Sequence, residues 1–370
     1  MEQTYYKTRD FGDIYRFIYQ KKECSRQQIA KELDISLPTV TRNLNFLSES
    51  SLINIGGSFR STGGRKANVY RCRPEARYAL GMDITRGHLS IVLVDLKLDI
   101  VDSERISFPF ADTKAYYDRL QKEVERFLGR QVVEKEKILG MGISLPAIIK
   151  GDQKTISYAT VVDATGNLYE EINSRIPYPS MLFNDANSAG LAESWVHYSE
   201  NPIIYLFLSN SVGGALMING KIFPGMNWRA SEFGHMKIIP NGKKCYCGKR
   251  GCLDAYCSAK KLSDFTNDNL KEFFEELALG NQGFRNVFDE YTDYLALALN
   301  NLRMCYDCDI ILGGTVGAYI EEYIPEIREK AAALDHLGKR GDYIIGCHYK
   351  TEAAAVGAAI YYISDFIDSL

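Results

Sequence analysis

The most specific chemistry in this sequence is a set of one histidine and three cysteines, His235, Cys245, Cys247 and Cys252, in the spacing H-x9-C-x-C-x4-C. One imidazole and three thiolates form a complete tetrahedral zinc set, and four protein ligands leave no open coordination position. The sequence therefore predicts a structural zinc ion that holds a loop, and a closed Cys3His set disfavours an iron or redox centre. Cys257 could replace one of the three cysteines as a ligand, but it lies outside the compact pattern. The competing interpretation is that these cysteines are reduced thiols in a loop without a metal.

Three short helices are predicted near the N-terminus, the last two joined by a tight turn at residues 34–35. The second helix begins at Ser25, with Gln28 at the spacing of a capping box, and Ser36 caps the third. Such a pair has helix-turn-helix geometry, in which the later helix lies in the major groove of DNA. The side chains expected on its outer face are polar: Thr39, Thr41, Arg42, Asn43 and Asn45.

A β-hairpin is predicted to follow from residues 52–55 and 68–71, with a glycine-rich connection that carries basic residues. Phosphates or a narrow minor groove would attract those basic side chains. We therefore predict a winged helix-turn-helix domain. The alternative is a small helical protein-interaction domain with a solvated basic loop. The predicted DNA-binding residues are Ser36, Thr39, Thr41, Arg42, Asn45, Arg60, Arg65 and Lys66.

Composition and charge are consistent with a DNA-binding head on a globular body. The chain has 370 residues, of which 46% are hydrophobic and 25% charged, as in ordinary globular proteins. Residues 1–75 hold 13 Lys and Arg against 8 Asp and Glu, whereas the remainder holds 31 against 39. A basic head favours an anionic partner, most commonly nucleic acid. Because no apolar run approaches the ~18 residues of a membrane helix and no secretory signal is visible, we expect a cytoplasmic protein without a membrane partner.

The rest of the chain is predicted to form two related α/β lobes. Strands at 78–83, 89–95 and 100–108 precede a helix at 114–128, and a similar strand-rich unit restarts near residue 202. A strand-strand-strand-helix unit used twice predicts a two-lobed sheet protein with a cleft between the lobes. The expected domains are 1–75 (winged helix-turn-helix), 76–190 (first lobe) and 191–370 (second lobe with the zinc loop), an arrangement that allows the last helix to pack back on the first lobe.

Several motifs together resemble the ROK family, which groups sugar-responsive repressors with sugar kinases. Residues 231–235 (SEFGH) and 245–254 (CYCGKRGCLD) are similar to the family's ExGH and CxCGxxGCxE signatures. Residues 183–187 (FNDAN) resemble its NDAN segment, and residues 142–146 (GISLP) its GxxxP strand-loop. The resemblance runs from about residue 8 to the C-terminus. A winged helix that leads directly into the first strand of the body is the layout of the family's repressor branch.

The resemblance implies an actin-like, sugar-kinase-like fold and a set of sugar-binding residues. In the family, the Asn and Asp of NDAN and the Glu and His of ExGH bond sugar hydroxyls, and that His also binds zinc. An acidic residue two positions after the last cysteine completes the set, and Asp254 stands where the family usually has Glu. Ala147 stands where the family often has Gly. The implied sugar-binding residues are therefore Asn184, Asp185, Glu232, His235 and Asp254.

The sequences of the two phosphate-binding loops distinguish the kinases of this family from its regulators. Family kinases carry a DxGxT loop and a GTGxGGG loop, whose glycines let backbone N–H groups approach ATP. Here the segments read DITRGH at 83–88 and SNSVGGA at 209–215, and the side chains of Thr85 and Arg86 would crowd the phosphates. We therefore predict no kinase activity. Asp185, the catalytic base of a family kinase, would act instead as a sugar hydrogen-bond acceptor.

The predicted function is a sugar-responsive, DNA-binding transcriptional regulator: a repressor of carbohydrate-metabolism genes that is released by a monosaccharide or a derivative. Its partners would be a double-stranded DNA operator and a second copy of the chain, as a homodimer or higher homo-oligomer. Two alternatives remain. One is a sugar kinase with an added DNA-binding head, and the other is a DNA-binding regulator whose sugar cleft is vestigial.

Overall fold

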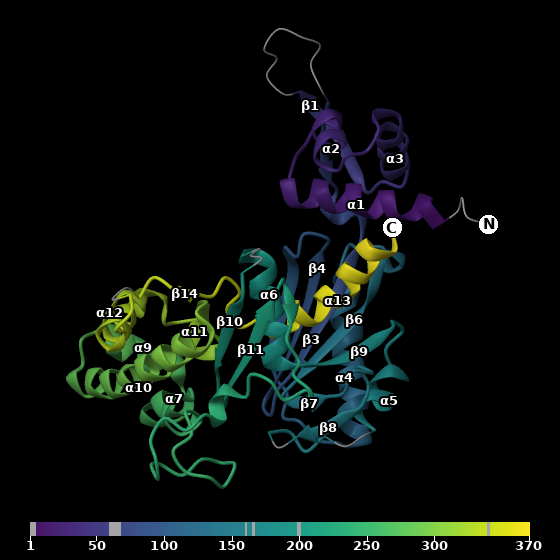
Figure 1. Cartoon of the computed structure of the whole chain (residues 1–370). Coiled ribbons are helices and arrows are strands. Elements are labelled where there is room, and N and C mark those ends of the chain that lie inside the picture. The colour runs from purple at the N-terminus through teal and green to yellow at the C-terminus, as the bar shows by residue number, and fades with distance from the viewer. Residues whose placement is uncertain (1–4, 59–67, 160, 165–166, 198–200, 339–340) are drawn as a thin grey trace.

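The computed structural model describes the chain except for residues 1–4, 59–67, 160, 165–166, 198–200 and 339–340, and the side chains of residues 5–10 and 58. A small N-terminal unit, residues 5–72, lies at one end of a larger two-lobed α/β unit, residues 78–370 (Figure 1). We call these two units the head and the body. In the described ranges, no helix combines the length and the apolar character that crossing a bilayer requires.

The head contains three helices and an antiparallel hairpin, as predicted. They are α1 (Tyr5–Lys21), α2 (Arg26–Glu32), α3 (Leu37–Glu49), β1 (Ile53–Ser58) and β2 (Asn68–Cys72). The capping box at the start of α2 is confirmed. The backbone N–H of Gln28 donates to the Ser25 hydroxyl at 3.3 Å, and the backbone N–H of Ser25 donates to the side-chain Oε1 of Gln28 at 2.8 Å. The predicted cap of α3 is also present, with the Thr39 N–H 3.3 Å from the Ser36 hydroxyl.

One prediction for α3 is wrong: Asn43 does not face outward but is fully buried. It lies three residues after Val40 and four before Leu47, both fully buried, so the 3.6-residue period places it on the core stripe of the helix. Neither polar atom of its side-chain amide has a hydrogen-bond partner. The hairpin tip residues Arg60, Arg65 and Lys66 lie outside the described part of the chain.

The two lobes of the body repeat one sheet topology. The first sheet has the order β5-β4-β3-β6-β9 and the second the order β12-β11-β10-β13-β14. In each sheet the first strand along the chain is central, the next two strands extend the sheet antiparallel on one side, and the last two extend it parallel on the other. The predicted two-lobed α/β repeat is therefore confirmed.

The strands of the first lobe are β3 (Tyr78–Ile84), β4 (His88–Asp95), β5 (Ile100–Ser107), β6 (Ile138–Leu145) and β9 (Ser180–Asn184), with a separate hairpin of β7 (Ala147–Ile149) and β8 (Ile156–Ala159). Its helical segments are η1 (Pro74–Ala76), α4 (Lys114–Gly129), η2 (Lys135–Lys137) and α5 (Leu168–Asn173).

The strands of the second lobe are β10 (Ile203–Leu208), β11 (Val212–Ile218), β12 (Lys221–Ile222), β13 (Asp309–Gly313) and β14 (Ile344–Gly346). Its helical segments are η3 (Phe233–His235), α7 (Asp254–Cys257), α8 (Lys260–Ser263), η4 (Asp264–Thr266), α9 (Leu270–Ala278), α10 (Gln282–Tyr306), α11 (Gly314–Gly317), η5 (Glu321–Tyr323) and α12 (Ile324–Leu334).

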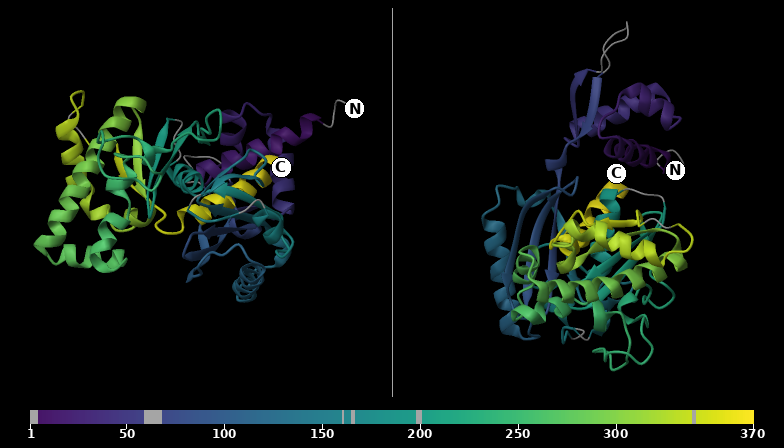
Figure 2. Two further views of the ribbon diagram at one scale, coloured as in Figure 1. Left: turned by 90° about the horizontal axis from the view of Figure 1, so that it is seen from below. Right: turned by 90° about the vertical axis from the view of Figure 1, so that its left-hand side faces the viewer.

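Two further helices lie side by side where the lobes meet: α6 (Asp185–His197) and α13 (Ala353–Ser369). Helix α6 packs on β10 and β11 of the second sheet, and α13 packs on β3 and β6 of the first (Figures 1 and 2). Glycines allow this close approach. A Cβ added at Gly357 would lie 1.7 Å from the Ser188 carbonyl oxygen, and one at Gly142 would lie 1.9 Å from the Ala358 carbonyl oxygen.

We expect the substitution Gly357→Ala to destabilise the body by about 3 kcal/mol, because the added methyl group must force α13 away from the α6 backbone. The matched control is Gly129→Ala at the end of α4, where an added Cβ meets no atom within 4 Å. Chemical denaturation measures both effects. Equal midpoints for the two variants would show that the contact between α6 and α13 is not tight.

Candidate functional site

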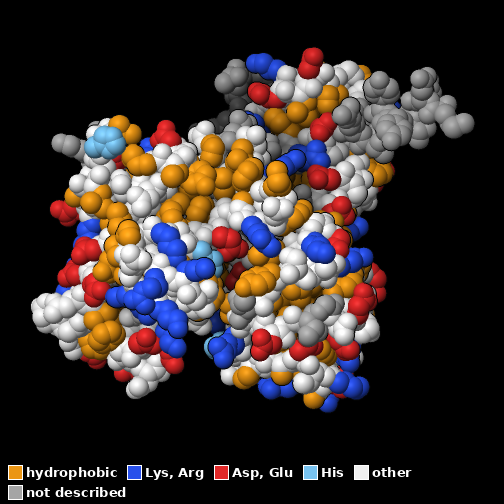
Figure 3. Space-filling model, turned by 60° about the horizontal axis from the view of Figure 1, so that its bottom comes forward, with side chains coloured by type: hydrophobic (Ala, Val, Ile, Leu, Met, Phe, Trp, Pro, Cys, Tyr) orange, Lys and Arg blue, Asp and Glu red, His pale blue; other side chains and the backbone are white. Residues whose placement is uncertain are grey.

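A cavity of about 1120 Å³ lies between the lobes, is lined by residues of both, and extends to Arg16 of the head. Figure 3 shows the molecule hollowed between its two lobes. Four of the five sugar-binding residues implied by the family resemblance line this cavity: Asn184, Asp185, Glu232 and His235. The structure thus brings together side chains that are up to 51 positions apart in sequence, from 184 to 235. We call the lined space the cleft.

Asn184 and Asp185 stand where β9 ends and α6 begins. The Asn184 side-chain nitrogen donates to the Ala147 carbonyl oxygen at 3.1 Å, and its amide oxygen accepts from the Asn187 N–H at 2.9 Å. Asp185 Oδ1 accepts from the Ala186 N–H at 2.9 Å. These bonds to the backbone orient both side chains before a ligand arrives, which lowers the entropic cost of binding.

The carboxyl groups in and beside the cleft are shifted toward their neutral forms. Burial, with the nearby charges of Asp83 and Glu232, raises the pKa of Asp185 to about 7. Burial also raises the pKa of Asp83 to about 6, although the hydrogen bond from Ser144 opposes the shift, and it raises the pKa of Glu232. Near neutral pH, Asp185 is therefore present both as an acceptor and as a donor, which suits hydroxyl groups.

Asp254 does not line the cleft. It is buried at the start of α7, and its Oδ2 accepts from the Val212 N–H at 2.7 Å. Val212 belongs to the segment 211–214, which does line the cleft. In the structure, Asp254 therefore holds a wall of the cleft in place, and its role as a direct sugar contact stays a prediction.

The predicted metal ligands form one cluster. Nitrogen or sulfur atoms of His235, Cys245, Cys247 and Cys252 all lie within 4.8 Å of one another. Cys247 Sγ is 3.8 Å from Cys252 Sγ, and His235 Nδ1 is 3.9 Å from Cys245 Sγ. A tetrahedral ion with metal–sulfur bonds of about 2.3 Å has edges of about 3.8 Å. The cluster therefore has the size and donor set that a tetrahedral ion requires.

The surroundings of the cluster also suit a metal. Lys237 Nζ lies 3.2 Å from Cys252 Sγ, where its charge offsets the net negative charge of a divalent ion held by three thiolates. The Tyr246 hydroxyl lies 3.3 Å from His235 Nε2, so the second ring nitrogen also has a partner. Sequence reasoning missed both residues. Cys257 is not part of the cluster, because its Sγ lies 3.8 Å from the Tyr291 carbonyl oxygen.

The backbone of the metal loop depends on glycine. Gly251 has a φ of +79°, and a Cβ at this position would lie 1.8 Å from the Ile239 carbonyl oxygen. Gly248 has a φ of +83° and donates its N–H to the Cys245 carbonyl oxygen at 3.0 Å. Only glycine adopts such conformations freely, so these two residues let the chain fold back around the cluster.

The loop that would face phosphates in a kinase is closed on itself. The Thr85 N–H donates to the His88 carbonyl oxygen at 3.0 Å, and the His88 N–H donates to the Thr85 hydroxyl at 3.0 Å. Two backbone N–H groups of this loop are thus bonded within the turn that joins β3 and β4. On the opposite lobe, the Gly314 N–H donates to the buried hydroxyl of Tyr205 at 3.0 Å.

The described DNA-binding candidates lie along α3 and at its start. Ser36, Arg42 and Asn45 are exposed, whereas Thr39 and Thr41 are half-buried. The Thr41 hydroxyl donates to the Leu37 carbonyl oxygen at 2.7 Å and accepts from Arg26 at 3.1 Å, so it serves the head internally. Arg42 and Asn45 are therefore the candidates within α3 whose side chains are exposed to solvent.

Comparisons with known proteins match both parts of the chain. The ROK family profile matches residues 79–364, and a winged helix-turn-helix DNA-binding profile matches residues 12–54. A xylose repressor of Bacillus spizizenii (strain ATCC 23059 / NRRL B-14472 / W23) is 24% identical over 99% of this chain and 98% of the relative.

Solved structures support the same fold. A ROK family transcriptional regulator, described as a homologue of the E. coli MLC protein, matches with a TM-score of 0.76 and 20% identity, covering 98% of this chain and 97% of that one. A ROK family glucokinase from Streptomyces griseus, in complex with glucose and AMPPNP, matches with a TM-score of 0.66 and 22% identity, covering 77% of this chain and 98% of that one. The glucokinase match covers a smaller share of this chain.

Proposed function

Because this chain belongs to the ROK family, we propose that it is a sugar-responsive transcriptional repressor, whose head binds a DNA operator and whose cleft binds a monosaccharide or a derivative of one. The observation that carries the proposal is the union, in one chain, of a winged helix-turn-helix with a cleft lined by oriented hydroxyl-binding groups. The alignment with a xylose repressor over nearly the full length of both chains supports the same function.

We also propose that the metal cluster holds zinc in a structural role. The fit rests on its three thiolates, one imidazole and tetrahedral dimensions. When bound, the ion supplies a fixed crosslink between η3 and the loop that carries Cys245, Cys247 and Cys252. The crosslink would hold His235 and, through it, Glu232 at the wall of the cleft.

A kinase is the weaker candidate. The internally bonded turn at Thr85 and His88 argues against a phosphate cradle there. Asp185, which in a kinase would remove a proton from the sugar, would then serve only to bind a hydroxyl. We propose that the chain does not transfer phosphate. Measured ATP hydrolysis that rises when a sugar is added would contradict this.

In the proposed mechanism, sugar binding starts no chemical reaction but shifts the populations of two arrangements of the lobes. A sugar that contacts Asn184 and Asp185 on the first-lobe side and Glu232 and His235 on the second-lobe side would favour a closed arrangement of the lobes. In a homodimer, closure would change the spacing of the two heads and mismatch the operator half-sites. About 3 kcal/mol of differential sugar binding would change operator affinity about 150-fold. We propose domain limits of 1–75, 76–190 and 191–370, with α6 crossing the second limit and α13 packing back on the first lobe.

Arg42→Ala is expected to weaken operator binding at least about tenfold, because an exposed arginine on the recognition helix contacts phosphate or a base edge. Fluorescence anisotropy with labelled operator DNA at a fixed salt concentration measures the effect. Arg71→Ala is the matched control, since Arg71 lies on β2 and pairs with Glu23 at 2.6 Å. Equal losses in the two variants would indicate a general charge effect instead of a contact by α3.

The proposed function is tested by titrating the complex of the protein and DNA from upstream of its own gene with a panel of monosaccharides. Specific binding that one sugar weakens is the expected result. Specific binding that no sugar alters would favour a vestigial cleft. Absence of specific binding together with sugar-dependent ATP turnover would favour the kinase.

A further inference from the structure

One helix connects the cleft directly to the head. Helix α6 begins at Asp185 in the cleft and ends at His197, which gives it a length of about 18 Å. Near its far end, Trp195 Nε1 donates a hydrogen bond to the Tyr19 hydroxyl in α1 of the head at 3.0 Å. The two rings also meet edge to face, with centroids 6.2 Å apart. The first turn of α6 thus lies among the candidate sugar-binding residues, whereas Trp195, at the end of the cavity lining nearest the head, contacts α1.

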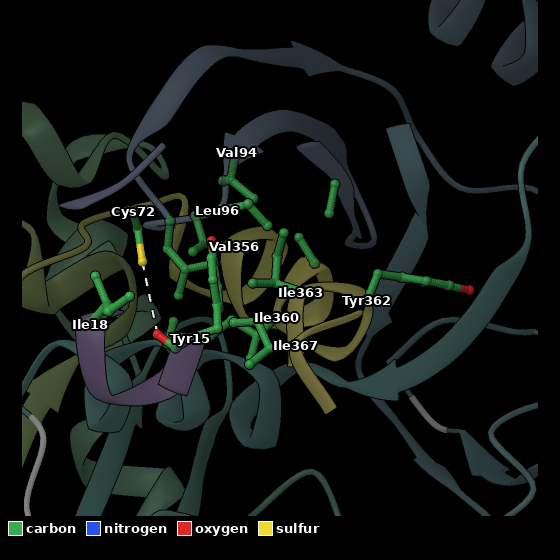
Figure 4. Packing of buried hydrophobic residues seen from close by; sticks show 14 of the residues in the cluster. Tyr15, Ile18, Cys72, Val94, Leu96, Val356, Ile360, Tyr362, Ile363 and Ile367 are labelled. Atoms are coloured by element: carbon green, nitrogen blue, oxygen red, sulfur yellow. Dashed lines mark hydrogen bonds between the residues drawn. The ribbon is translucent and has the colours of Figure 1, made fainter. Parts of the chain in front are cut away.

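The head is held on the body by a shared hydrophobic core. Figure 4 shows Tyr15 and Ile18 of α1 beside Val356, Ile360, Ile363 and Ile367 of α13, and all six are buried in one cluster. An ion pair between Arg16 and Asp368 joins the same two helices at the surface. These contacts fix the head to α13, and Trp195 adds a contact from α6.

The C-terminal half of α6 is bonded to the chain segment that crosses between the lobes. The Glu193 side chain is fully buried, and its carboxylate accepts from the His348 N–H at 2.8 Å and the Tyr349 N–H at 2.7 Å. Residues 347–352 lead from β14 of the second lobe to α13 on the first. A change in the angle between the lobes therefore acts on α6 at this point.

We propose that α6 carries the occupancy of the cleft to the head, and that the hydrogen bond from Trp195 to Tyr19 is the contact through which the head responds. This inference rests on the proposed function and names the positioning residues of its regulation. Apart from the exposed ion pair between Arg16 and Asp368, the packing of α1 on α13 is apolar and non-directional, so small rotations change it little. A hydrogen bond between two rings depends on distance and angle and is lost with a displacement of about 1 Å. It therefore distinguishes two placements of α6 that the apolar core tolerates equally.

The decisive variant is Tyr19→Phe, which removes the accepting hydroxyl and keeps the ring. Trp195→Phe removes the indole N–H that donates this hydrogen bond from α6. The matched control is Tyr362→Phe, because the Tyr362 hydroxyl is buried on α13 in the same cluster and has no hydrogen-bond partner. For each protein, operator affinity is measured without sugar and with a saturating concentration of the monosaccharide that most weakens operator binding in the panel titration. The affinity for that monosaccharide is measured by calorimetry on the full chain.

We expect Tyr19→Phe to bind sugar as the unaltered protein does, while the sugar-dependent change in operator affinity falls by about fivefold. Trp195→Phe should show a comparable loss, and the double variant should lose no more than either single variant, since both remove one bond. Tyr362→Phe should keep the full response. Comparable losses in all three variants would instead indicate a general effect of removing a buried polar group from this cluster.

The outcomes separate this inference from the proposed function. If the unaltered protein responds to sugar and Tyr19→Phe responds equally, or if Tyr362→Phe loses the response as well, the role of the Trp195–Tyr19 bond is overturned and the repressor function stands. If the unaltered protein binds its operator but no sugar changes that binding, the proposed function fails and the inference fails with it.

Discussion

Cys247→Ser is expected to lose zinc and, with it, most of the response to sugar. Cys247 is an exposed member of the four-ligand cluster, so its replacement removes a thiolate ligand with little effect on core packing. Zinc content should fall from about one ion per chain to near zero, because a neutral serine hydroxyl is a poor zinc ligand. Sugar affinity should fall at least about tenfold, since the ion would fix His235 and the segment that carries Glu232.

Metal analysis of the purified protein and calorimetry with the effector sugar measure these two effects. Cys305→Ser is the matched control, because Cys305 is also exposed and lies outside the cluster. It should retain both zinc and sugar binding. A zinc-free Cys247→Ser protein with unchanged sugar affinity would break the proposed link between the metal loop and the cleft.

Asp185→Ala is expected to weaken sugar binding about 100-fold while operator binding in the absence of sugar stays unchanged. The carboxyl group is held by the Ala186 N–H at the start of α6 and lines the cleft. Hydrogen bonds to a charged group contribute about 1.5–3 kcal/mol each, and a sugar presents neighbouring hydroxyls to both carboxylate oxygens. Calorimetry and operator anisotropy measure the two affinities. Asp163→Ala, at an exposed aspartate of the same lobe, should leave both unaltered.

The same residue should make sugar binding depend on pH. Burial raises the pKa of Asp185 to about 7, so the protonated form dominates below that pH. If the sugar donates hydrogen bonds to the carboxylate, binding must displace this proton, and affinity should fall as pH drops below 7, by at most about tenfold per unit. The Asp185→Asn variant should show a flatter profile between pH 6 and 8. An unaltered slope in that variant would assign the pH dependence to another group.

Local sequence signals predicted much of the head and the metal loop. The capping box at Ser25 and Gln28 and the cap at Ser36 act over three residues, so their spacing alone located the starts of two helices. The metal ligands are also predictable, because a Cys3His set is specific and its cysteines lie within a few residues of one another. Of the three strands predicted in the first lobe, those at 78 and 100 begin at the predicted residue, and β4 begins one residue earlier than predicted.

Features set by tertiary packing were harder to predict. Asn43 is polar, and polar residues usually face solvent, yet the helical period places it on the buried stripe. The structure bonds Asp254 to the Val212 backbone, 42 positions away, which no local pattern indicates. The strands β9 and β14 were not predicted as strands, because each is short and acquires its partner from a distant part of the chain. The contact between Trp195 and Tyr19 joins residues 176 positions apart.

The shared core of α1 and α13 bears on how such proteins are recombined by domain shuffling or by protein engineers. The α1 helix of a head grafted from a relative would have to pack on Ile360, Ile363 and Ile367 of α13. In this protein those side chains are packed against its own α1, whose residues differ from those of the grafted helix. A grafted head that does not fit should leave this apolar surface of α13 exposed. Such a chimera should aggregate, or its head should no longer pack on the body. The transferable unit is therefore a discontinuous one, made of the head together with the last turns of α13, and a chimera that exchanges both pieces should retain its allosteric control.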